Sequence, residues 1–289
     1  MLNHTADVVV VTYRPGGTIA SFLRSASESE GVASVTVVDN ASGDDVAQRA
    51  AAEAGAAFVQ TGRNGGYGSA ANAGASRGVA PWILISNADI VLEAGAVAGL
   101  LAVAHDDERI GAVGPHVQEI DGTTYPSARP LPTVMLGAGH ALFGRVWPGN
   151  PWTRRYRLSL DPQGGEVDAG WLSGSCFLVR RTAWERLGGF DESYFMFFED
   201  VDLGRRLGDA GYRMVWTPRA LVTHLGGHSY RSDPAPMLTA HHHSARKYLA
   251  SAYPHWWQAP MRGVMAAGLA ARERAEVAAA RRRLTTRAD

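Results

Sequence analysis

The chain has 289 residues, of which 46% are hydrophobic and 19% charged; this ordinary balance for a folded globular protein excludes a disordered or fibrous chain. Lys plus Arg and Asp plus Glu both total 28, so the overall charge gives no reason to expect nucleic acid as a partner. Cys176 is the only cysteine, which excludes an internal disulfide framework and a cysteine-rich zinc module. We predict that it is a small core residue.

No apolar run approaches the roughly 20 residues that cross a bilayer, and the N-terminus lacks a basic region followed by a long apolar segment. A single cysteine also fits a reducing compartment. We therefore expect a cytoplasmic protein.

The first part of the chain alternates between apolar strand patterns and helical patterns. We predict strands at residues 7–13, 35–38, 57–60, from 82 and 110–113, and helices at residues 18–27, 44–54, after the glycine-rich turn 64–68, and 95–104. This alternation favours a mostly parallel sheet layered between helices.

The pattern changes after residue 117. Asp121 and Gly122 suggest a hairpin, and residues 126–165 are too long and irregular for a plain connection, which is typical of a functional loop or a disordered segment. Strands are expected at 167–172, 177–179, 214–216 and 221–223, with helices near 182–187, up to about 210 and from 236. We predict one domain over residues 1–235, with halves 1–117 and 118–235, and a helical extension over 236–289.

Asp39 and Asp89 form the first candidate pair. Each follows a predicted buried strand, and 50 residues separate them. A single Asp after a strand is more often a turn or helix cap. Because ligands of open α/β sheets bind beyond the carboxyl ends of the strands, two acids at equivalent positions favour a site for a metal or a sugar-phosphate.

The glycine-rich turn at residues 64–74 has two readings. Its glycines do not match the G-x-G-x-x-G dinucleotide spacing, and no G-x-x-x-x-G-K-[ST] sequence occurs. It is either a tight turn with close helix packing or a loop whose backbone N–H groups approach a nucleotide. The neighbouring acids favour the second reading.

A third constellation spans residues 194–206, Tyr-Phe-Met-Phe-Phe-Glu-Asp-Val-Asp-Leu-Gly-Arg-Arg. Aromatic residues before carboxylates would desolvate them and raise the pKa toward that of a useful general base. Alternatively, the carboxylates begin a helix and interact favourably with the positive end of its dipole; they are Glu199, Asp200 and Asp202. Both interpretations can be true, but three carboxylates in four positions exceed what helix capping requires.

Histidines supply two further candidates. His224 follows an apolar strand; a lone His there is more often a hydrogen-bonded structural residue, but it could complete a mixed Asp and His site for Mg²⁺ or Mn²⁺. His241, His242 and His243 lie in a predicted helix and cannot share one face, so we expect them on the surface.

Taken together, these blocks resemble the family 2 glycosyltransferases of GT-A fold, most closely the bacterial rhamnosyltransferase branch that builds cell-wall and surface polysaccharides. Among the matching segments are Asn-Gly-Gly-Tyr-Gly-Ser-Ala-Ala-Asn-Ala-Gly and Phe-Phe-Glu-Asp-Val-Asp-Leu. In order, the segments are residues 9–13, 37–44, 64–74, 86–89, 171–181, 188–192, 197–203, and His224 with Gly227 and Ser229. The resemblance implies an α/β, Rossmann-like mixed sheet, mostly parallel and flanked by helices.

The resemblance also implies roles for single residues. Asp200 would be the general base, with Glu199 beside it, and Asp89, assisted by His224, would hold a divalent metal, Mg²⁺ or Mn²⁺. Donor-binding residues would be Thr12, Tyr13, Asp39, Asn40, Asn64, Gly65, Gly66, Asn72, Asn87 and Asp89, with Asp39 on the base or ribose. Acceptor-binding residues would be Trp171, Gly174 and Asp202.

The sequence departs from the family pattern at three places: at two motifs, and in residues 126–165, which match no family segment and leave the acceptor open. Tyr13-Arg14 replaces the usual Tyr-Asn, and Asn87-Ala88-Asp89 replaces Asn-Pro-Asp and lacks the first carboxylate of D-x-D. Metal binding would therefore depend mainly on Asp89.

We expect a metal-dependent, inverting glycosyltransferase that uses a nucleotide-sugar, dTDP-L-rhamnose being favoured, and a glycan or lipid-linked glycan acceptor. The alternatives are a transferase for another hexose from a UDP-sugar and a non-catalytic sugar-nucleotide-binding subunit of a glycan assembly complex. Residues 261–284 carry six Arg and an apolar face. This helix either lies on an anionic membrane, placing the protein at the inner face of the plasma membrane, or is solvated or forms a homodimer.

Overall fold

The computed structural model describes residues 4–133, 158, 160–226 and 235–285, with side chains described up to residue 282. Most of the segment 126–165, and the motif residues Gly227 and Ser229, lie outside the described residues. The helices of the described chain are α1 (Thr18–Ser27), α2 (Val46–Glu53), α3 (Tyr67–Ala75), α4 (Ala96–Asp106), α7 (Arg181–Leu187), α8 (Glu199–Asp209), α9 (Ala235–Ala252), the 3-10 turn η3 (Trp256–Gln258) and α10 (Ala259–Thr285).

A mixed sheet organises the molecule, with strand order β3-β2-β1-β4-β11-β6-β12-β5. Strands β3, β2, β1 and β4 run parallel, whereas β11 is antiparallel to both β4 and β6. The strands are β1 (Ala6–Thr12), β2 (Val32–Asp39), β3 (Ala57–Gln60), β4 (Trp82–Asn87), β5 (Ile90–Leu92), β6 (Ile110–Glu119), β7 (Thr124–Tyr125), β8 (Ala128–Arg129), β9 (Val167–Ala169), β10 (Trp171–Leu172), β11 (Cys176–Arg180) and β12 (Arg213–His224). The expected α/β class is therefore confirmed.

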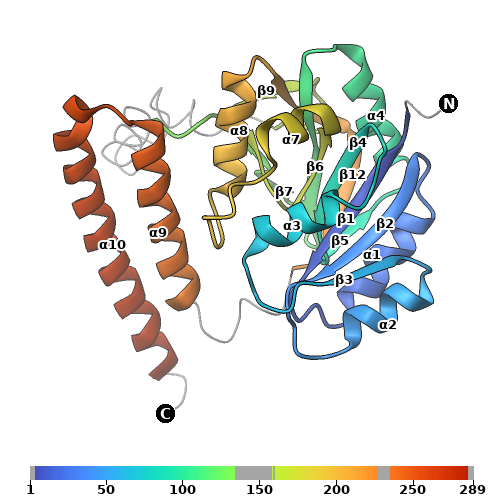
Figure 1. The fold of residues 1–289 in the computed structure, drawn as a ribbon, viewed down its shortest axis with the longest axis horizontal. Coiled ribbons are helices and arrows are strands. Elements are labelled where there is room, and N and C mark those ends of the chain that lie inside the picture. The colour runs from blue at the N-terminus through green and yellow to red at the C-terminus, as the bar shows by residue number, and fades with distance from the viewer. Residues whose placement is uncertain (1–3, 134–157, 159, 227–234, 286–289) are drawn as a thin grey trace.

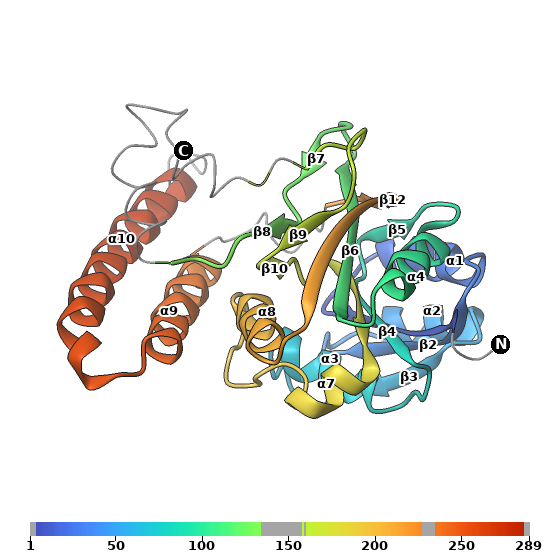
Figure 2. The ribbon, with the colours of Figure 1, turned by 90° about the horizontal axis from the view of Figure 1, so that it is seen from above.

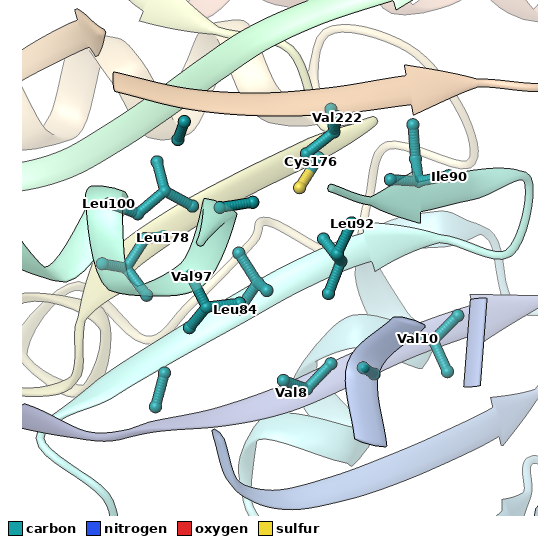
Figure 3. Close-up of a cluster of buried hydrophobic side chains, with 14 of the residues drawn as sticks. Val8, Val10, Leu84, Ile90, Leu92, Val97, Leu100, Cys176, Leu178 and Val222 are labelled. Carbon is teal, nitrogen blue, oxygen red and sulfur yellow. The ribbon is translucent and has the colours of Figure 1, made fainter. Parts of the chain in front are cut away.

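The central strands are apolar without alternation because helices cover both faces of the sheet. On one face, β1 contributes Val8 and Val10 to a core closed by α1 and α4 (Figure 3). On the other face, Val9 and Val11 pack with residues of α3, α7 and α8. Cys176 is buried in the first core, as predicted, and burial raises the pKa of its thiol to about 12.

Two features differ from the sequence expectations. The two short strands expected at 214–216 and 221–223 form the single strand β12, whose pairing with β6 shifts register between Thr217 and Leu221. Pro218 lies in this irregularity, where its missing N–H interrupts the ladder. In addition, the chain turns after β4 and forms β5, which pairs antiparallel with β12.

The helices α9 and α10 form an antiparallel hairpin beside the end of the domain that contains α8 (Figures 1 and 2). Arg246 pairs with Glu273 at 2.7 Å, and the His242 ring contacts Glu276 at 3.0 Å. The predicted surface position of His242 is wrong, because its side chain points into the hairpin and is 2% exposed. Among the described residues, no helix combines the length and the apolar composition that a membrane-spanning segment needs.

Candidate active site

The carboxyl ends of β1, β2 and β4 meet at one edge of the sheet. In the strand register Thr12 lies opposite Asp39, and Val11 lies opposite Asn87. Asp89 follows shortly after Asn87, in the turn to β5. The structure thus brings the two predicted strand-end acids to the same edge, where α/β proteins bind ligands.

Asp39 is a buried carboxylate held by its own loop. Its Oδ1 accepts hydrogen bonds from the hydroxyls of Thr12 and Ser42, and its Oδ2 accepts one from the backbone N–H of Ser42 at 3.0 Å. The Ser42 hydroxyl in turn accepts from the backbone N–H of Arg14 at 2.7 Å. These contacts fix Asp39 at the sheet edge, and its contact with a base or ribose stays a prediction.

Asn40 connects the β2 edge to the glycine-rich turn. Its amide nitrogen donates to Asn64 Oδ1 at 2.9 Å and to the carbonyl of Gly66 at 3.1 Å. Its amide oxygen accepts from the backbone N–H of Gly65 at 3.1 Å. The side chain therefore fixes the turn that the sequence suggests for nucleotide contact.

Gly66 lies against the aromatic segment Tyr194–Phe198. It has φ +93°, and a Cβ added there would lie 2.2 Å from the carbonyl oxygen of Phe195. The next residue, Tyr67, donates its backbone N–H to that same oxygen at 3.1 Å. Glycine is thus required at position 66 both by conformation and by the close approach of the second segment.

The aromatic segment leads directly into the carboxylates that begin α8. Phe197 and Phe198 both have positive φ, 66° and 67°, which is costly for side chains of this size. Two successive left-handed residues turn the chain sharply, so that Glu199 is buried and Asp200 is partly exposed at the start of the helix. The strained residues directly precede the candidate catalytic carboxylates, and strain of this kind is common at functional sites.

Asp200 is held by backbone donors. Its Oδ2 accepts from the N–H of Gly174 at 3.0 Å, and its Oδ1 accepts from the N–H of Val201 at 2.8 Å. Burial raises the pKa of Asp200, although these two hydrogen bonds act in the opposite direction. Burial, and then the charge of Asp200, raise the pKa of Glu199, whose Oε2 is buried and has no hydrogen-bond partner in the part of the chain that the structure describes. The desolvation predicted from the aromatic residues is therefore present.

Tyr67 joins the two groups of acids, and sequence reasoning missed it. Its hydroxyl donates to the carbonyl of Gly174 at 2.5 Å, beside the Gly174 N–H that binds Asp200. Burial, followed by the charges of Glu199, Cys176, Asp200 and Asp89, raises the pKa of Tyr67 well above its usual value. The tyrosine thus lies among acids from the turn after β4 and from the start of α8. Its place within the Asn64–Gly74 motif is the one signal that could have indicated it.

His224 stands between two carboxylates at the end of β12. Its Nε2 lies 3.2 Å from Asp89 Oδ2, and its Nδ1 lies 3.2 Å from both oxygens of Glu119. The hydrogen bond to Asp89 is the main cause that raises the pKa of His224 to about 9. The predicted approach of His224 to Asp89 is present, whereas Glu119 was not anticipated.

One oxygen of Asp89 fits a metal ligand. Asp89 Oδ1 is buried and has no hydrogen-bond partner in the described chain, and carboxylate oxygens are preferred by Mg²⁺ and Mn²⁺. Both ring nitrogens of His224 lie 3.2 Å from carboxylate oxygens, and its role in metal binding stays a prediction. Among the described residues, no three His, Cys, Asp or Glu side chains are arranged to hold one ion.

The remaining predicted residues differ in their surroundings. Tyr13 is exposed, with the Arg14 guanidinium 5.3 Å from its ring centroid. The Asn72 side chain is engaged with the backbone of Phe190 and with Glu192. Their donor-binding roles stay predictions.

On the acceptor side, Trp171 packs against α8, where a Cβ at Gly204 would meet it at 2.7 Å. Asp202 is buried and pairs with Arg205 at 2.9 Å and with Arg206 at 2.7 Å. Both of its oxygens are therefore engaged within α8, and acceptor binding by Asp202 or Trp171 stays a prediction.

Comparison with known families gives a match to the model of the glycosyltransferase-like family 2 over residues 4–241. A similar curated protein is the N-acetylglucosaminyl-diphospho-decaprenol L-rhamnosyltransferase of Mycobacterium tuberculosis, 43% identical over 290 residues, which cover 96% of this chain and 94% of that protein. The rhamnosyltransferase WbbL of Escherichia coli is 40% identical over 80 residues, 28% of this chain and 30% of that protein.

Among solved structures, the chain resembles the mannosyltransferase PcManGT of Pyrobaculum calidifontis in complex with GDP-Man and Mn²⁺. The TM-score is 0.58 at 19% identity, with 98% of this chain and 79% of that chain covered. Similarity at this level of identity concerns the fold alone, and it agrees with the GT-A architecture expected from the motifs.

Proposed function

The chain belongs to the family 2 glycosyltransferases, and from this premise we propose that it transfers L-rhamnose from dTDP-L-rhamnose to an N-acetylglucosaminyl diphosphate carried on a polyprenol. The observation that carries the proposal is the 43% identity, over 96% of the chain, to a rhamnosyltransferase whose name states that acceptor. The geometry around Asp200 supports the chemistry.

In the proposed reaction Asp200 acts as the general base. A carboxylate oxygen takes the proton from the acceptor hydroxyl while the hydroxyl oxygen attacks the anomeric carbon, and the nucleoside diphosphate leaves with the electron pair of the broken bond. A single displacement of this kind inverts the anomeric configuration. The N–H groups of Gly174 and Val201 orient the carboxylate, and each of its oxygens keeps a lone pair for the proton.

Glu199 is buried directly before Asp200, and Tyr67 contacts the Gly174 backbone that binds Asp200. Because the pKa of Glu199 is raised, its carboxyl retains a proton to higher pH than an exposed Glu, which reduces the negative charge beside Asp200. Tyr67 holds the Gly174 backbone through its hydrogen bond to the carbonyl. Asp89 would hold a divalent metal through Oδ1. When bound, the metal would neutralise the charge that develops on the departing diphosphate.

The test is a transfer assay with the full chain, Mn²⁺ and N-acetylglucosaminyl diphosphate farnesol as acceptor, with dTDP-L-rhamnose and UDP-glucose as separate donors. We expect the mass of one deoxyhexose to be added from dTDP-L-rhamnose, with inverted configuration by NMR and with loss of activity in EDTA. Transfer from UDP-glucose only would support the alternative hexosyl donor. Binding of dTDP without turnover of either donor would support a non-catalytic subunit.

A further inference from the structure

A cavity of about 520 Å³ lies between the C-terminal hairpin and the aromatic segment Tyr194–Phe198. One face of α9 supplies most of its wall, because Pro236, Ala240, His243 and Arg246 recur at helical spacing. Phe195 closes one side and Arg281 of α10 closes another. The cavity exists only because the hairpin stands beside the catalytic domain.

We propose that this cavity binds the diphosphate of the acceptor together with the first part of its polyprenyl chain. The inference rests on the proposed function and adds a subsite to it. Arg246, Arg281 and His243 line the cavity, and none of the described Asp or Glu residues does. Guanidinium groups bind phosphate oxygens through paired hydrogen bonds. Among the other wall residues, Phe195, Pro236 and Ala240 offer the apolar contact that an isoprenoid requires.

The two arginines have donors left for an anion. Arg246 pairs with Glu273 through Nη1 at 2.7 Å, which fixes the guanidinium and uses only part of its five N–H groups. Arg281 is exposed, and no carboxylate of the described chain pairs with it. A diphosphate carries enough oxygens to contact both groups.

The cavity is connected to the catalytic groups through the aromatic segment. The Ser244 hydroxyl donates to the carbonyl of Met196 at 2.8 Å, and the His241 ring contacts those of Phe197 and Phe198 with centroids 5.5 and 5.4 Å away. Phe195 therefore lies in both the cavity wall and the segment that leads into Glu199 and Asp200. In the acceptor, one sugar ring separates the diphosphate from the attacking hydroxyl. A diphosphate in the cavity could therefore place that hydroxyl near Asp200.

The experiment measures binding of farnesyl diphosphate to the full chain by isothermal titration calorimetry. EDTA and saturating dTDP are present, so that the donor site does not take up the probe. The variants are Arg281→Glu and the matched control Arg274→Glu, an exposed residue of the same helix outside the cavity wall. Loss of a charge-assisted contact and introduction of a like charge should weaken binding by about tenfold or more in Arg281→Glu. Arg274→Glu should bind as the wild type does.

Equal affinity in the two variants, or no binding by the wild-type chain, would overturn the assignment. The result does not depend on turnover, so the two proposals can fail separately. Intact farnesyl diphosphate binding with no rhamnosyl transfer would reject the proposed function alone. Where transfer occurs, Arg281→Glu should raise the KM for the diphosphate acceptor about tenfold and leave the KM for dTDP-L-rhamnose unchanged.

Discussion

The two ends of the parallel strands hold buried carboxylates of different character. At the amino end, Asp7 accepts hydrogen bonds from Ala80 N–H at 2.7 Å, Arg181 Nη2 at 2.8 Å and the Ser34 hydroxyl at 2.6 Å. Near the carboxyl end, Asp89 Oδ1 and Glu199 Oε2 are buried and have no hydrogen-bond partner among the described residues. An unsatisfied buried oxygen is costly, so its retention indicates a group that meets a ligand, a metal or a proton. The paired Asp7 stabilises the fold, whereas we propose that the unpaired oxygens of Asp89 and Glu199 take part in the chemistry. Asp39, at the same carboxyl end, is held by Thr12 and Ser42.

Removing the buried ion pair between Asp7 and Arg181 should have the largest effect on stability. Asp7→Ala leaves the Arg181 guanidinium buried without its carboxylate, and we expect a loss of about 3–5 kcal/mol in the free energy of unfolding. Urea denaturation measures the loss. The control is Asp45→Ala, which breaks the exposed pair with Arg49 and should cost less than about 1 kcal/mol. Similar losses in the two variants would erase the distinction between the buried pair and an ordinary surface pair.

Glu199→Gln should act in the opposite direction and depend on pH. The raised pKa of Glu199 favours folding while the carboxyl is protonated; this stability is complete below the ordinary Glu pKa and is lost as the pH rises through the raised value. Glutamine does not ionise. The variant should therefore be more stable than the wild type at alkaline pH, by more than about 1 kcal/mol, and similar to it near pH 4. Urea denaturation across this range measures the difference.

The exposed Glu53 supplies the matched control, because Glu53→Gln should leave the pH dependence of stability unchanged. A Glu199→Gln variant whose advantage is the same at every pH would show that Glu199 ionises normally in the folded protein.

Tyr67→Phe should have the smallest effect. The variant removes the hydroxyl that donates to the Gly174 carbonyl and keeps the ring in place. We expect about 1 kcal/mol of lost stability and a few-fold decrease in kcat, with the KM for the donor unchanged. Steady-state kinetics measure kcat and the donor KM separately, and urea denaturation measures the stability. A donor KM that rises while kcat is constant would place Tyr67 in donor binding instead of in the positioning of Asp200.

The sequence predicted the features that depend on local pattern. Apolar runs ending in Asp39 and Asp89 located the sheet edge, because neighbouring residues in the sequence form both the strand and its polar end. The aromatic residues before Glu199 likewise predicted its desolvation. Tyr67 and Glu119 could not be found in this way, because their importance arises from contacts with Gly174 and His224, far along the chain. His242 was misplaced because the partner helix α10 covers it.

The role of an acidic residue at the site depends on whether its carboxylate is paired within the fold or left unpaired. Asp202 shares the acidic pattern of Glu199 and Asp200, but the helix turns its carboxylate toward Arg205 and Arg206. The structure is needed to distinguish an acid that pairs with arginines of its own helix from an acid that borders a site.

The most direct test of the central assignment compares wild-type protein with Asp200→Asn in the rhamnosyl transfer assay, alongside dTDP binding and urea unfolding of both proteins. Asparagine keeps the size of the side chain but cannot accept the hydroxyl proton as a carboxylate does. We predict that transfer falls by roughly 10²- to 10⁴-fold while dTDP affinity and the unfolding transition are retained. Transfer by Asp200→Asn at the wild-type rate would contradict the assignment of Asp200 as the general base.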